Sequence, residues 1–259
     1  MAATFRLASF RTNKTDIVSL ALRLVEAGAL FGVARLHGWW TLAALGVVLI
    51  EVVGVWQTEH GLPVDKLMER IPAMVMGASV AVVITITPRE AAQFVVALAF
   101  GVWRWWWNPK GVNGNLGLAN LLAVETVAFW AIFLMSAEWR TYEWLILALV
   151  WAAAYVPVIA VLRQRGERMA SVLAAAWALV AAEISWVLVR WLFVYVMPQG
   201  YLLIPQAAVV LAAMGYVFGS IYMAQRDGKL SRSRLTEYVL IGLILIAIVI
   251  TGTPWRGSL

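Results

Sequence analysis

Long apolar runs separated by short polar segments recur along the whole chain. Each run holds about 20 residues, the length of helix that crosses a hydrocarbon core of about 30 Å. We therefore predict nine membrane-spanning helices, with boundaries good to a few residues, at 16–36, 39–57, 65–87, 89–107, 116–137, 142–162, 169–196, 203–225 and 234–253.

The apolar runs are continuous and rich in Ala, Leu and Val, without the apolar–polar alternation of a transmembrane barrel. Because a spanning segment must satisfy its own backbone hydrogen bonds, helices are the remaining solution. Composition agrees, since 63% of the residues are hydrophobic and 13% are charged, against about 25% charged in soluble domains. The expected fold class is all-α, a polytopic bundle forming a single transmembrane domain over residues 1–259.

The formal charge of +6 reflects how Lys and Arg are distributed between the two sides of the predicted bundle. The alternate loops and span ends carry fourteen Lys and Arg residues on one side of the membrane and four on the other. Arg23 and Arg190, inside the spans, complete the twenty. By the positive-inside rule, the N-terminus is cytoplasmic and the C-terminus is outside. We expect an integral protein of the prokaryotic cytoplasmic (inner) membrane, and no nucleic-acid partner.

Two short similarities suggest an inverted repeat. Residues 31–35 (FGVAR) resemble 100–104 (FGVWR), and 51–56 (EVVGVW) resemble 125–130 (ETVAFW). The offset is three spans, so spans 1–3 (about 16–87) and spans 4–6 (about 89–162) would run in opposite directions, as in many secondary transporters. Spans 7–9 (about 169–253) have no clear counterpart. Chance matches in Val- and Ala-rich helices explain these similarities equally simply.

Tryptophan is unusually frequent, with fifteen copies that lie mostly near span ends, where the indole ring prefers the headgroup level. Trp130, Trp151 and Trp177 lie deeper in their spans. These three are predicted either to pack in the core or to line a ligand pocket, and core packing is the simpler of the two.

Six charged side chains lie deep inside the predicted spans, more than five residues from either end: Arg23, Glu26, Glu51, Glu125, Glu183 and Arg190. A charge in hydrocarbon costs at least about 2.5 to 3.5 kcal/mol, so such residues normally face a bundle interior, a partner or water. From the helix rise, Arg23 and Glu51 lie about 10 Å deep, and Glu26 and Glu125 about 15 Å deep. We therefore expect these four in one layer of the membrane.

This layer predicts ion or proton coupling. Arg23 and Glu26 are three residues apart and can pair on one helix, which leaves Glu51 and Glu125 without a local cation. A carboxylate near the midplane that exchanges a proton for a bound ion beside a competing Arg is what a coupled transporter needs. Glu183 is the third candidate carboxylate, and we expect Arg190 to snorkel toward the outer surface. Buried ion pairs that merely lock helix packing are an equally physical interpretation.

Several chemistries are disfavoured. The chain has no Cys, and its four Lys lie outside the predicted spans or at their very ends, so a retinal Schiff base is excluded. The two His lie at span ends on opposite sides, which argues against haem and zinc sites. No Asp lies mid-membrane to support aspartyl proteolysis. We expect no enzyme activity, cofactor or metal, and we least favour an intramembrane enzyme that acts on lipid.

The sequence therefore predicts a small-solute or ion transporter or channel, in which coupling runs through Glu51 and Glu125 with Arg23 as counter-charge. The alternative is a non-enzymatic membrane subunit, a scaffold or a pigment- or lipid-binding component of a larger membrane complex. The expected partners are the lipid bilayer, a small solute or ion, and either further copies of the chain or other membrane chains.

Overall fold

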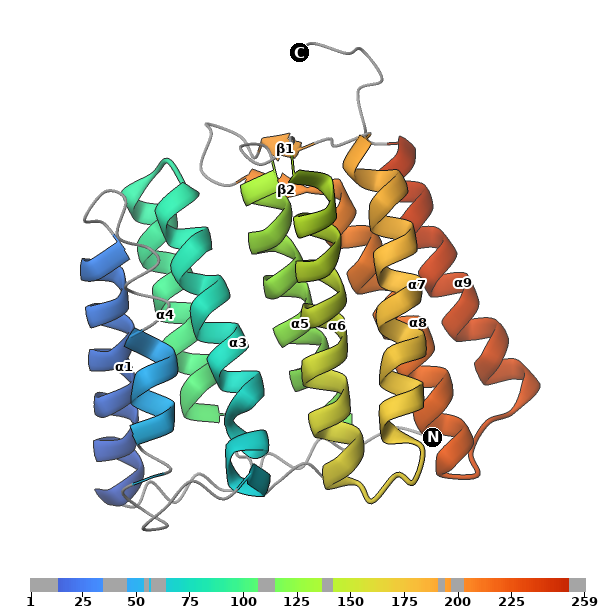
Figure 1. Cartoon of the computed structure of the whole chain (residues 1–259), viewed down its shortest axis with the longest axis horizontal. Coiled ribbons are helices and arrows are strands. Elements are labelled where there is room, and N and C mark those ends of the chain that lie inside the picture. The colour runs from blue at the N-terminus through green and yellow to red at the C-terminus, as the bar shows by residue number, and fades with distance from the viewer. Residues whose placement is uncertain are drawn as a thin grey trace, which may run out of the picture.

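The chain folds into a bundle of long helices whose axes run in roughly the same direction (Figure 1). The computed structural model describes residues 14–34, 46–53, 56, 64–106, 115–136, 142–190, 194–196 and 203–251. Residues 46–53 form a short helix. The other elements are α1 (Lys14–Ala34), α3 (Val64–Ile86), α4 (Glu90–Trp106), α5 (Asn115–Ser136), α6 (Glu143–Gln164), α7 (Ala170–Arg190), β1 (Val194–Val196), β2 (Leu203–Pro205), α8 (Gln206–Arg226) and α9 (Arg232–Thr251).

Five helices in the described part of the chain are long and apolar enough to cross a membrane. They lie within α3, α5, α6, α7 and α8, over Glu69–Ile86, Gly117–Ser136, Glu143–Gln164, Ala170–Arg190 and Gln206–Arg226. The prediction of a helical membrane protein is confirmed at this level. Each of the nine predicted apolar runs contains helix, although α1, the helix 46–53, α4 and α9 are not among these five.

The prediction of one unbroken span over 169–196 is wrong at its end. α7 stops at Arg190, and β1 pairs in antiparallel register with β2, with Tyr195 opposite Ile204. A helix of the predicted length would extend about 42 Å, well beyond a hydrocarbon core of about 30 Å. The sequence Val-Tyr-Val of β1 consists of residues that favour strands. The start of the predicted span 203–225 is likewise strand, so the fold is not purely helical.

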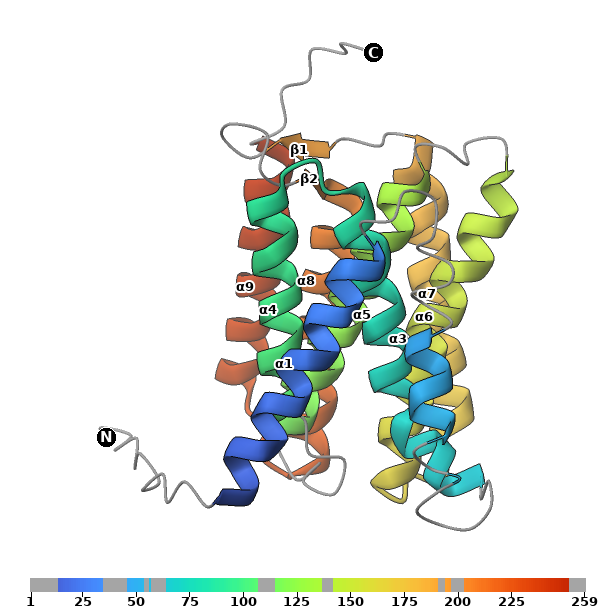
Figure 2. The ribbon, with the colours of Figure 1, turned by 90° about the vertical axis from the view of Figure 1, so that its left-hand side faces the viewer.

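The helices form two groups connected through α3. α1 packs on α4, and α3 contacts both α1 and α4. On its other side α3 packs on α5 and α6. α5 then contacts α6 and α8, α6 packs on α7, and α8 packs on α9. Figure 2, viewed from the side of the first group, shows α1 crossing in front of α3 and α4.

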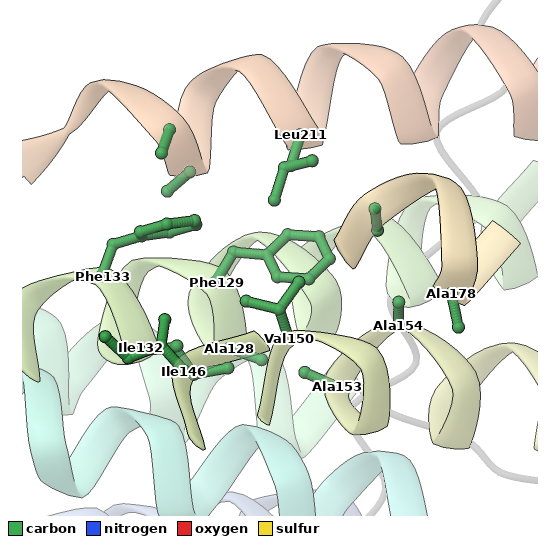
Figure 3. Close-up of a cluster of buried hydrophobic side chains, with 13 residues drawn as sticks. Ala128, Phe129, Ile132, Phe133, Ile146, Val150, Ala153, Ala154, Ala178 and Leu211 are labelled. Carbon is green, nitrogen blue, oxygen red and sulfur yellow. The ribbon is translucent and has the colours of Figure 1, made fainter. Parts of the chain in front are cut away.

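The core of the second group combines large aromatic side chains with alanines. Phe129 and Phe133 of α5 are fully buried against Val150 of α6 and Leu211 of α8 (Figure 3). Buried alanines lie where α6 and α7 meet, at Ala153, Ala154, Ala178 and Ala181. Because lipid is as apolar as the side chains, such close van der Waals packing, rather than escape from water, holds membrane helices together.

Two turns of similar construction lie at one end of the bundle, the lower end in Figure 1. α6 ends before Gly166, which has φ +67°, and α8 ends before Gly228, which has φ +65°. In each turn the glycine N–H donates three residues back and the next N–H donates five back, which is the Schellman arrangement. Glycine adopts this left-handed conformation without the steric penalty of a side chain. Charged residues gather in and next to these two turns, including Arg165, Glu167, Arg168, Asp227 and Lys229.

Candidate functional site

Glu51 and Arg104 form a buried ion pair. Glu51 lies in the helix 46–53 and Arg104 in the last turns of α4, and each is 4% exposed. Nη2 of Arg104 donates a hydrogen bond to Oε1 of Glu51. The other carboxylate oxygen of Glu51 lies 3.5 Å from Nη1 of Arg70, which comes from α3. Both oxygens of Glu51 are therefore engaged by arginines.

Glu26 joins the same cluster from α1. Its Oε2 accepts a hydrogen bond from Nη1 of Arg23 at 2.8 Å, and its Oε1 lies 3.8 Å from Nε of Arg104. Arg23, Glu26, Glu51, Arg70 and Arg104 are called the ion-pair cluster from here on. With three cations facing two carboxylates, the cluster connects α1, the helix 46–53, α3 and α4. Each carboxylate has at least one arginine partner. Such ion pairs between helices can hold the helices together.

Glu125 does not join this cluster. It is 3% exposed, and its Oε1 accepts a hydrogen bond from the Trp177 indole N–H at 2.8 Å. None of the ion pairs among the described residues includes it. Its neighbour Val124 packs with Val80 and Phe100 in the core of the first helix group. Glu125 and the ion-pair cluster therefore belong to different sets of contacts.

Glu125 forms part of the wall of a cavity of about 320 Å³ between α5, α6, α7 and α8. This space, called the Glu125 cavity, is lined almost entirely by apolar side chains such as Leu121 and Val158. Leu173 of α7 and Phe218 of α8 also line it, and they are 38% and 50% exposed. The cavity therefore reaches the molecular surface between α7 and α8.

Two glycines of α8 make room for this cavity. A Cβ at Gly215 would lie 3.3 Å from Oε2 of Glu125, and one at Gly219 would lie 2.6 Å from Cδ1 of Leu118. Gly215 and Gly219 have the small-xxx-small spacing that lets helices approach closely, and both lie against side chains of α5. Gly28 and Gly32 in α1 have the same spacing, but no atom of the residues that the structure describes lies within 4 Å of a Cβ at either position.

Tyr222 closes one end of the Glu125 cavity at the α6–α7 turn. It lines the cavity, and its hydroxyl donates a hydrogen bond to Oε2 of Glu167 at 2.7 Å. This hydrogen bond holds the pKa of the Glu167 carboxyl below its usual value, and Arg226, 3.8 Å away, acts in the same direction. The turn between α6 and α7 is thereby fastened to α8.

Glu183 lies at neither site. It is on the exposed side of α7, while Ala174, Ala178, Ala181 and Ser185 form the buried side. At 100° per residue, Glu183 is about 200° around the helix from Ala181, so it points away from the bundle. Arg190, as expected, lies at the surface, where it stacks on Trp186 at 4.5 Å and pairs with Glu143 at 3.8 Å.

Sequence reasoning missed Arg104 and Arg70, which it assigned to one side of the membrane by counting charges. The signal was present for Arg104, which precedes three tryptophans inside the predicted span 89–107. Glu51 had no local cation, and such a residue requires a partner from another helix. Of the deep tryptophans, Trp177 lines the Glu125 cavity, Trp130 donates to the Leu203 carbonyl at 2.7 Å, and Trp151 is 39% exposed.

Comparison of the chain with family models, with curated proteins and with solved structures finds no match.

Proposed function

We propose that this protein is a multi-pass membrane transporter for small amphipathic solutes, with Glu125 as the residue that couples solute binding to a proton. The observation that carries the proposal is a buried carboxylate in the wall of an apolar cavity that opens between two membrane-spanning helices. Glu125 is the eleventh of 22 residues in α5, close to the midplane, where secondary transporters hold their substrates.

The cavity chemistry indicates the kind of solute. Its walls are apolar, so an inorganic ion would lose its hydration without replacement oxygens. A solute with an apolar body and one cationic group satisfies both the wall and the carboxylate. Because an isolated charge in this environment is costly, Glu125 is neutralised either by a proton or by such a cation. Exchange between the two couples solute movement to proton movement.

The ion-pair cluster has a different part in this proposal. Glu26 and Glu51 face three arginines, so an incoming cation would have to displace an existing partner. We assign the cluster to holding the first helix group together, with coupling confined to Glu125. The accompanying topology is nine membrane crossings with a cytoplasmic N-terminus, because the α6–α7 and α8–α9 turns carry many of the basic residues.

The test is flux in proteoliposomes, with ethidium as the cationic probe and an imposed pH gradient. Wild-type protein should take up more ethidium with the pH gradient than without it. Glu125→Gln should abolish the pH-dependent uptake while the protein elutes from gel filtration as wild type does. Glu143→Gln, a matched change on an exposed carboxylate, should leave uptake unchanged. Uptake by Glu125→Gln at the wild-type rate, or none by the wild-type protein, would overturn the proposal.

A second function, a subunit of a larger membrane complex, is favoured by Glu183. This carboxylate is exposed on α7 next to the exposed apolar side chains Leu179 and Trp186. Facing lipid, its charge would be costly, and a partner chain that covers it would remove that cost. Purification in mild detergent distinguishes the two functions. A subunit should elute together with other chains, and the Glu183→Leu variant should lose them. A transporter should elute alone or as copies of itself.

A further inference from the structure

A second cavity lies on the other side of α8, between the connected ends of α8 and α9. Its volume is about 560 Å³, and residues of α5, α8, α9 and the α8–α9 turn line it. The helices touch closely farther along, where a Cβ at Gly242 would lie 2.3 Å from Cγ2 of Val217. Figure 1 places the α8–α9 turn at the same end of the bundle as the α6–α7 turn.

The rim of this cavity is basic. Lys229 of the turn and Arg234 in the first turn of α9 line it, together with the hydroxyl-bearing side chains Ser220 and Tyr238. Asp227, the acidic residue in the lining, lies 3.6 Å from Lys229 in a well-exposed pair. Nη1 of Arg234 donates to the Lys229 carbonyl at 3.3 Å, which holds the guanidinium next to the turn. Two cations and several hydroxyl donors thus converge on one space.

The inner wall of the cavity is apolar. Leu118 and Leu122 of α5 and Met223 of α8 line it, and the same three residues line the Glu125 cavity. Beyond the cavity, the outer surface of α9 presents exposed apolar side chains, including Leu240, Leu243 and Ile244. A ligand that fits must therefore carry an anionic, hydrogen-bond-accepting head and an apolar tail that can lie along α9.

We propose that this cavity binds the phosphate headgroup of an anionic phospholipid. The cavity lies at a membrane-helix end surrounded by basic turns, which is where headgroups are found. Arg and Lys with hydroxyl donors match the oxygens of a phosphate. The apolar inner wall and the exposed face of α9 favour a lipid over a soluble phosphate, because only a lipid covers both. This site does not depend on the proposed transport function.

The experiment measures lipid retained by the full chain. Protein in mild detergent is equilibrated with phosphatidylglycerol or phosphatidylcholine of identical acyl chains, and bound lipid is counted by native mass spectrometry. Wild-type protein should retain phosphatidylglycerol in preference to phosphatidylcholine. The double variant Lys229→Gln with Arg234→Gln should lower phosphatidylglycerol retention by about tenfold or more, because each charge-assisted hydrogen bond strengthens binding by at least that factor.

Two further measurements test whether the lipid binds in this cavity and whether the ligand is a lipid rather than free phosphate. The matched variant Arg163→Gln with Arg168→Gln removes two exposed charges at the same end but outside the cavity, and it should retain lipid like the wild type. Inorganic phosphate at millimolar concentration should not displace the lipid. Equal retention of both lipids, equal loss in both double variants, or displacement by inorganic phosphate would each overturn the proposal.

Discussion

Trp177 donates its indole N–H to Oε1 of Glu125 across 2.8 Å, which connects α7 to α5 through the wall of the Glu125 cavity. The ring of Trp177 also packs against Phe218 of α8, with centroids 5.7 Å apart. One side chain therefore orients the carboxylate and sets the shape of the cavity next to it. The Trp177–Glu125 pair, unlike the ion-pair cluster, places a buried carboxylate next to a cavity.

Replacing Trp177 by Phe should separate these two roles. An aromatic ring is kept, but the N–H donor and part of the indole are lost, so the free energy of unfolding should fall by at least about 1 kcal/mol, the size of an interhelical hydrogen bond in a membrane. Trp151→Phe is the matched control, because Trp151 stacks on Tyr155 at the surface. Reversible unfolding in mixed micelles measures both. Equal effects of the two changes would show that the Trp177 N–H contributes nothing.

The ion-pair cluster should be the most sensitive polar feature of the fold. Glu51→Gln removes the negative charge that Arg104 faces while leaving that arginine buried. Breaking one side of a buried pair costs about 3–5 kcal/mol, whereas an exposed pair contributes about 0–1 kcal/mol. Arg190→Gln, which breaks the exposed pair with Glu143, should therefore be close to neutral in the same unfolding assay.

A double replacement tests whether the loss comes from the uncompensated charge. Glu51→Leu together with Arg104→Met removes both partners and substitutes apolar side chains of similar size. The stability of the double variant should exceed that of Glu51→Gln alone, because well-packed apolar residues often replace a buried pair at little cost. A double variant less stable than the single one would show that the cluster stabilises through more than charge pairing.

The apolar pattern was enough to predict the helices but not all of their ends. A run of about 20 apolar residues has one low-energy solution in a membrane, so each of the nine runs contains helix. The pattern failed at 194–196. These residues are apolar, which suits a helix and a strand equally, and they form a strand that pairs with 203–205. Length carried the missing information, because that predicted span was too long for the hydrocarbon core.

The sequence predicted that the candidate carboxylates Glu51 and Glu125 are buried, but not which helices they face. Counting residues from a helix end gives the level of a side chain, and Glu51 and Glu125 are both buried as expected. It does not say which neighbouring helix the side chain meets. The rotation of α5 directs Glu125 toward Trp177, and the rotation of α7 directs Glu183 outward. Arg104 entered the charge count as a topological marker, which concealed its role as the partner of Glu51.

The glycines offer a further prediction, because some of them lie against a neighbouring helix and others are exposed. Gly242→Ala would place a methyl group 2.3 Å from Cγ2 of Val217, a β-branched side chain with little freedom to move. We expect a loss of about 1–3 kcal/mol, as for other overpacked positions. Gly28→Ala has nothing within 4 Å of the new methyl group and should be neutral or stabilising. Equal effects would contradict the α8–α9 contact.

Acid should weaken the α6–α7 turn through Glu167. The Tyr222 hydroxyl, and then Arg226, hold the pKa of Glu167 below its ordinary value of 4.5. A carboxyl with a lowered folded-state pKa contributes stability that is fully present above 4.5 and is lost as the pH falls through the folded-state value. Thermal unfolding measured from about pH 6 to about pH 3 should therefore show an unfolding temperature that falls toward the acid end for the wild-type protein.

Tyr222→Phe removes the hydrogen bond that is the largest cause of the lowered pKa. The variant should start at a lower unfolding temperature near neutral pH and lose less on acidification, so that the two curves converge below pH 4.5. Tyr155→Phe, which removes a hydroxyl from the stacked pair with Trp151, should follow the wild-type curve. Wild-type and Tyr222→Phe curves that stay parallel throughout would mean that the Tyr222 hydroxyl does not change how Glu167 protonates in the folded chain.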